Sequence, residues 1–98
     1  MLDDGFLAIK NQYVGTFKLK QEELLSAFES KDKDALLRYL HKLAGSSGGY
    51  GFTKIYQLCL ETRELIENNF KQDFELISEK VKEMSSQLLH EYNKLSSM

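Results

Sequence analysis

Apolar residues recur along the chain with the three- to four-residue period of amphipathic helices. The period appears in four stretches, separated by polar, glycine-rich or asparagine-rich breaks. Four such helices with short connections predict an all-α fold, an antiparallel up-down four-helix bundle. The inward positions are Phe6, Ile9, Tyr13, Phe17, Leu24 and Phe28; then Leu36, Leu40 and Leu43; then Phe52, Ile55, Leu58, Cys59, Thr62, Leu65 and Ile66; and finally Phe74, Ile77, Val81, Met84, Leu88 and Leu95.

Local signals at the breaks predict where these helices begin, bend and end. Gly15 is a weak point at which the first helix could bend. Ser30 or Asp32 can cap the second helix, and the glycine cluster that begins at Gly45 should end it. Asn69, with Gln72 three residues later, resembles the capping box of a fourth helix.

Composition and charge narrow the classes of protein. The 98 residues suffice for one core, so we expect a single domain, residues 1–98. The formal net charge is −2 and the 13 basic residues are dispersed, which argues against nucleic-acid binding. No apolar stretch approaches the roughly 20 residues of a membrane span, and no signal peptide is recognisable. The single cysteine, Cys59, lies on an apolar stripe and is interpreted as a core residue. We therefore expect a cytoplasmic protein that binds neither nucleic acid nor membranes.

One histidine precedes a run of small residues in "LRYLHKLAGSSGGYGF", Leu37 to Phe52. At about 100° per residue, His41 projects roughly 130° from the mean direction of the second helix's apolar seam, so it should be exposed. Ala44, Gly45 and Gly48 lie three, four and seven residues on and share its face. On the functional interpretation, these small residues leave space around the histidine for a partner to approach. The alternative is a solvated histidine followed by a helix stop and a flexible turn.

The segment "HKLAGSSGGYGF", together with "LCLE" at Leu58 to Glu61, resembles the signature of histidine-containing phosphotransfer (HPt) domains. Members of this family are four-helix bundles that relay phosphoryl groups between the receiver domains of response regulators. The resemblance implies that His41 carries the phosphoryl group and that Gly45 is the small residue that lets a partner dock. Receiver domains, and a hybrid sensor kinase as a further candidate, are the implied partners.

The chain departs from the family pattern at two positions. Ala44 stands where the family often has a lysine near the phosphoryl group, and Lys42, the nearest alternative, projects about 100° away. Arg63 stands 22 residues after the histidine, where a Gln or Glu that orients the ring is common. Arginine has donors only, so it cannot accept from the imidazole, although it could contact a phosphoryl oxygen.

These observations lead to one preferred function and two alternatives. We expect a phosphocarrier without ATPase or autokinase activity, with His41 as acceptor and no metal or cofactor of its own, Mg²⁺ being expected in the partner receiver. We also expect a monomer. The alternatives are a bundle that binds receivers or other signalling domains without being phosphorylated, and the histidine-bearing substrate module of a larger kinase. The predicted partner-binding residues are Leu37, Arg38, Lys42, Ala44, Gly45, Gly48 and Arg63.

Overall fold

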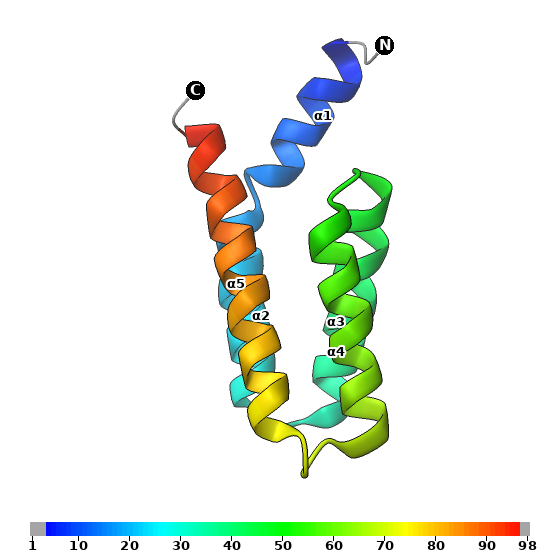
Figure 1. Cartoon of the computed structure of the whole chain (residues 1–98). Helices are drawn as coiled ribbons and strands as arrows, with labels where there is room; N and C mark the ends of the chain where they lie inside the picture. Colours follow the sequence, from blue (N-terminus) through cyan, green and yellow to red (C-terminus); the bar gives the residue numbers. More distant parts are fainter. Residues whose placement is uncertain (1–3, 97–98) are drawn as a thin grey trace.

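The computed structural model describes residues 4–96, and this part of the chain contains five helices and no strand (Figure 1). The helices are α1 (Asp4–Val14), α2 (Phe17–Glu29), α3 (Lys33–Gly49), α4 (Thr53–Asn69) and α5 (Phe74–Ser96). The all-α prediction is therefore confirmed, and the predicted count of four helices is wrong. The first predicted helix is two helices.

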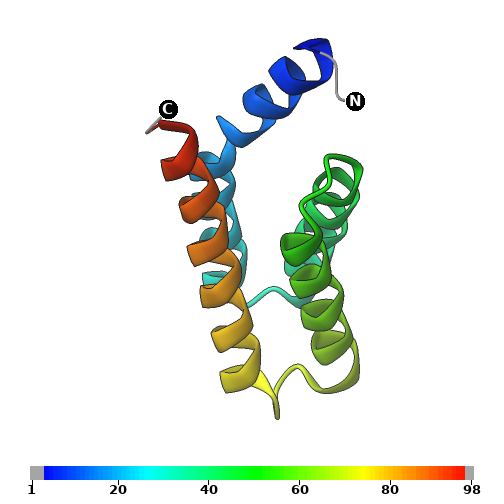
Figure 2. The ribbon, with the colours of Figure 1, turned by 45° about the horizontal axis from the view of Figure 1, so that its top comes forward.

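The break between α1 and α2 falls at Gly15 and Thr16. The Gly15 amide donates to the Asn11 carbonyl (3.0 Å), whereas the Thr16 amide and hydroxyl both donate to the Tyr13 carbonyl, at 3.0 Å and 2.6 Å. A Cβ on Gly15 would lie only 3.2 Å from the Gln12 carbonyl oxygen. The tight turn at the weak point therefore ends α1, and α1 leaves the axis of α2 at a steep angle (Figures 1 and 2).

Helices α2 to α5 alternate in direction and share one apolar core (Figure 1). The predicted inward positions of the last three stretches are buried or half-buried, so those three stripes are confirmed. Ile9 is an exception in the first stretch, because its side chain is 50% exposed. It belongs to α1, which lies at one end of the molecule and so buries little of its own surface in the core. The fully buried side chains with the largest volumes are Phe17, Leu24, Leu36, Leu40, Ile55, Ile66, Ile77, Met84 and Leu88.

Aromatic contacts attach α1 to the end of α3. The ring of Tyr13 stacks on that of Tyr50, with centroids 4.4 Å apart, and meets the ring of Phe17 edge-on at 5.0 Å. The ring centroids of Phe6 and Tyr50 are 6.5 Å apart. The Tyr13 hydroxyl also shares a 2.5 Å hydrogen bond with the Ser46 hydroxyl of α3. These contacts join the N-terminal helix to the segment that follows His41.

Helix α3 has a defined signal at each end. Asp32 is its N-cap, accepting from the amides of Asp34 (3.0 Å) and Ala35 (3.2 Å), so of the two predicted caps Asp32 is correct. The prediction that the glycine cluster ends this helix is confirmed, although Gly45 and Gly48 still lie within α3, which continues to Gly49. Gly51, with a φ of 83°, ends it in a Schellman arrangement.

The hydrogen bonds at the end of α3 match that motif. The Phe52 amide donates to the Ser47 carbonyl (2.9 Å) and the Gly51 amide to the Gly48 carbonyl (3.2 Å). At the next break, the predicted capping box of Asn69 and Gln72 is wrong, because Asn69 is the last residue of α4 and α5 begins only at Phe74.

Lys31, between α2 and α3, holds a left-handed backbone conformation with a φ of 59°. A side chain is disfavoured there by about 1 kcal/mol. We expect Lys31→Gly to raise the free energy of unfolding by up to about 1 kcal/mol, measured by urea denaturation. Lys31→Ala keeps the Cβ and should bring no such gain. Equal stabilities for the two variants would show that the left-handed conformation carries no cost.

Candidate functional site

His41 lies at the middle of α3 with an exposed side chain. Its neighbours Leu40 and Leu43 are buried in the core. The helix therefore turns its seam inward and the imidazole outward, which confirms the direction predicted from the helical period. Leu37, one turn earlier, is half-buried against the core, and Arg38 is exposed.

Ala44 does not belong to the open face. Its side chain is only 4% exposed and is part of the core. The prediction that Ala44 is a bare residue available to a partner is therefore wrong. The physical reason is that Ala44 projects about 60° from His41 in the direction of the buried seam, where the neighbouring helices cover it.

Gly45 and Gly48 share the face of His41 but have different surroundings. A Cβ on Gly45 would meet no atom within 4 Å, so the space one turn beyond the imidazole is open. A Cβ on Gly48 would lie 3.0 Å from Cδ1 and 3.3 Å from Cε1 of Tyr56 on α4. Gly48 therefore provides a seat for the Tyr56 ring, and only Gly45 leaves unoccupied space beside His41.

The two serines between these glycines have structural roles. Ser47 is buried, and its hydroxyl donates to the Ala44 carbonyl (3.3 Å). Ser46 donates to the Leu43 carbonyl (3.3 Å) and contacts Tyr13 of α1. The small residues after His41 thus let α3 bury one side and receive α1 on another.

Arg63 is half-buried on α4. Its Nε atom is buried and lacks a hydrogen-bond partner among the residues that the structure describes. Its positive charge acts on the nearby Cys59 thiol. Burial raises the pKa of that thiol to about 12, and Arg63 only partly opposes the increase. The interpretation of Cys59 as a core residue is confirmed by its complete burial, 3.7 Å from the Met84 sulfur.

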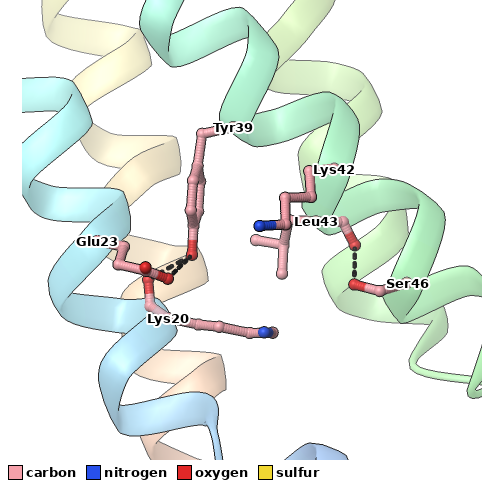
Figure 3. A pocket seen from close by; sticks show the side chains of 6 residues that line it. All are labelled: Lys20, Glu23, Tyr39, Lys42, Leu43 and Ser46. Carbon is pink, nitrogen blue, oxygen red and sulfur yellow. Dashed lines mark hydrogen bonds between the residues drawn. The ribbon is translucent and has the colours of Figure 1, made fainter.

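Lys42 points away from the His41 face. Figure 3 shows its side chain and that of Lys20 projecting from α3 and α2 into a cavity of about 90 Å³ between the two helices. The Tyr39 hydroxyl, on the wall of this cavity, donates to the Lys20 carbonyl (3.0 Å) and to Glu23 (3.2 Å). Lys42 therefore belongs to the groove between α2 and α3, as its angle from His41 predicts.

Two exposed apolar residues on α4 were missed by the prediction. Tyr56 is 38% exposed and Leu60 is 39% exposed. They share a face of α4 with Arg63, and Tyr56 contacts α3 at Gly48. The signal that could have found them is their position, because both are large apolar side chains outside the stripe of their helix.

The described part of the chain holds no group of three or more His, Cys, Asp or Glu side chains that could bind a metal ion. His90, the second histidine, is exposed on α5. None of the helices within residues 4–96 is long and apolar enough to cross a membrane.

An exposed histidine at the middle of a helix, beside a position with no side chain, is the arrangement expected for a phosphotransfer module. The family model of the Hpt domain matches residues 12–97. The chain belongs to the Hpt domain family, whose members are phosphotransfer modules of two-component phosphorelays. Comparisons with curated proteins and with solved structures found no match.

The two glycines on the His41 face allow a direct comparison of stability. Gly45→Ala should raise the free energy of unfolding by up to about 1 kcal/mol, because alanine favours the helix and the new Cβ meets open space. Gly48→Ala should give a smaller gain or a loss, because the Tyr56 ring must shift. Thermal and urea unfolding measure both. A larger gain at Gly48 than at Gly45 would contradict the close seating of Tyr56.

Proposed function

We propose that this protein is a phosphocarrier in which His41 accepts a phosphoryl group from the aspartyl phosphate of one receiver domain and passes it to another. The observation that carries the proposal is the exposed His41 with open space at Gly45, one turn further along α3. Membership of the Hpt family supports the same role. In this proposal α2 to α5 are the family's antiparallel bundle and α1 is an additional N-terminal helix.

The proposed transfer needs only a neutral, accessible imidazole from this chain. Near neutral pH a histidine keeps a substantial neutral fraction, in which one ring nitrogen has a lone pair. In the proposed step the Nε2 lone pair of His41 attacks phosphorus in line, the bond from phosphorus to the aspartyl oxygen breaks, and the carboxylate leaves. Because an aspartyl phosphate is already reactive, the remaining requirements are positioning and charge stabilisation. We propose that the receiver's acidic site supplies the Mg²⁺.

The surface around His41 suits a receiver that presents an acidic site. Tyr56 and Leu60 on α4 and the half-buried Leu37 supply apolar contact area. Arg38 and Arg63 supply positive charge that can offset the added −1.5 to −2 charges of a phosphoryl group. Lys42 would contact only a partner that reaches the groove beside α2. We propose that the protein acts as a monomer and has no ATPase or autokinase activity.

The first test of this proposal is the site of phosphorylation. A phosphorylated receiver domain should transfer an acid-labile, base-stable phosphoryl group to the parent chain. His41→Gln should remain folded, because the side chain is exposed, and should lose the label completely. His90→Gln should keep it. ATP and Mg²⁺ without a receiver serve as the blank.

The outcomes of this experiment separate the functions. A folded His41→Gln variant that still takes the label would refute the assignment of the acceptor. A parent chain that binds the receiver and stays unlabelled would favour a non-phosphorylated interaction module.

The second test concerns access to His41. Gly45→Leu should fold, because the position opens to solvent, and should slow transfer from the receiver by at least about 100-fold, because in-line attack tolerates little displacement. Lys82→Leu is the matched surface control on α5, since Lys82 is exposed and forms no ion pair within the described residues. Stopped-flow transfer rates and thermal unfolding measure both properties. Transfer by Gly45→Leu at the parent rate would exclude docking over this position.

A further inference from the structure

Arg63 has an unused hydrogen-bond donor in a buried position. Its Nε is the one buried side-chain nitrogen or oxygen without a partner among the described residues. The guanidinium also forms no ion pair within those residues. A buried donor that is left unpaired costs free energy, so a partner that arrives later would bind there favourably.

The register between α3 and α4 places Arg63 beside His41. Gly48 faces Tyr56, and the two helices run in opposite directions (Figure 1). Seven residues are about two turns and return to nearly the same face. One such step back from Gly48 reaches His41, and one step forward from Tyr56 reaches Arg63.

The position of the guanidinium refines this placement. Side chains on a helix lean toward its N-terminus, and Cys59, whose thiol lies within reach of the Arg63 charge, is one turn earlier on α4. By the same register Cys59 lies at the level of Gly45. The head of Arg63 therefore lies between the levels of His41 and Gly45, next to the open space at Gly45.

The donors of Arg63 match the phosphorylated histidine better than the free one. A neutral imidazole that is ready to attack through Nε2 carries its proton on Nδ1, and an arginine cannot accept that proton. Transfer to Nε2 leaves the proton on Nδ1, and once that proton passes to solvent the neutral phosphorylated ring offers a lone pair on Nδ1 and the phosphoryl oxygens, all of them acceptors. Arg63 is therefore complementary to the product of the transfer.

We propose that Arg63 donates to the phosphorylated side chain of His41 and prolongs the lifetime of the phosphoryl group. This inference rests on the function proposed above. In hydrolysis, water attacks phosphorus, the Nε2–P bond breaks and its electron pair returns to Nε2. The ring leaves readily only when Nδ1 already carries a proton, so that neutral imidazole departs and the water gives its proton to solvent. A cation beside the ring opposes protonation of Nδ1 and so slows this step.

Other charged side chains near the ring also affect how easily Nδ1 is protonated. They include Asp34, Arg38 and Lys42 on α3, Arg63 and Glu67 on α4, and Lys20 and Glu23 on α2. Lys42, Lys20 and Glu23 line the cavity on the other side of α3 (Figure 3). Arg63 is the half-buried member of the set on the His41 side, where solvent screens its charge less than that of the exposed Arg38 and Glu67.

The test measures the loss of the phosphoryl group without a receiver. Phosphoramidate phosphorylates exposed histidines and releases ammonia, and a His90→Gln background leaves His41 as the one acceptor histidine. The hydrolysis rate is followed by ³¹P NMR from pH 5 to pH 9 for this parent, Arg63→Gln, Arg63→Lys and Lys82→Gln. Lys82→Gln removes one positive charge from α5 and is the matched control.

We expect Arg63→Gln to move the midpoint of the rate profile to higher pH, because the ring then binds a proton more easily. At pH 8 the variant should lose its phosphoryl group roughly three- to tenfold faster, the factor that half to one pH unit represents. In acid, where every ring is protonated, the rates should converge. Arg63→Lys should recover part of the slow rate, and Lys82→Gln should follow the parent.

The outcomes separate this inference from the proposed function. A His41 that takes no label from phosphoramidate or from a receiver would overturn both. A labelled parent whose rate profile is unchanged in Arg63→Gln would overturn the role of Arg63 and leave the carrier function standing. Arg63→Met, which keeps the aliphatic stem and loses the donors, repeats the test if Arg63→Gln does not fold. Thermal unfolding of each variant excludes a general loss of structure.

Discussion

The contact between the ring of Tyr56 and the bare backbone of Gly48 is the constraint on which the rest of the site depends. A Cβ at Gly48 would stand 3.0 Å from the ring, so the absence of a side chain lets Tyr56 of α4 lie against α3. Since helices are stiff over two turns, this one contact also determines which residues meet further along. By the antiparallel register it places Arg63 near the level of His41, while the space at Gly45 stays open.

The small residues of α3 have different roles, because one side of this helix is covered by its neighbours and another side is accessible. Ala44 and Ser47 are small because the neighbouring helices cover them, and Ser47 satisfies its buried hydroxyl on the Ala44 carbonyl. Gly48 receives a ring, and Gly51 ends the helix with a positive φ. Gly45, one turn beyond His41, faces open space. A single run of small residues therefore serves packing, termination and access at different positions.

The sequence pattern predicted what depends on periodicity and missed what depends on neighbours. The seam of Leu36, Leu40 and Leu43 and the outward direction of His41 follow from the helical period alone, and both are correct. The period could not show that neighbouring helices bury Ala44, or that the Tyr56 ring lies against Gly48.

The same distinction applies at the helix ends. Asp32 was recognisable as a cap because capping is local. The complete break at Gly15 depends on how α1 packs at the end of the molecule. The continuation of α3 through Gly45 and Gly48 depends on how α4 packs against it. Those are tertiary effects, which outweigh the weak intrinsic preference of glycine. The role proposed for Arg63 likewise depends on a tertiary feature, the burial of its Nε without a partner among the residues that the structure describes.

The stack of Tyr13 on Tyr50 also has an optical consequence. The chain has no tryptophan and five tyrosines, so its near-ultraviolet spectrum comes from phenol and phenyl rings alone. Two phenols with centroids 4.4 Å apart and planes 14° from parallel couple their transitions, and one belongs to α1 while the other follows α3. Near-ultraviolet circular dichroism thereby gives an intrinsic signal for the packing of α1 against the end of α3, separate from the far-ultraviolet signal of the helical backbone.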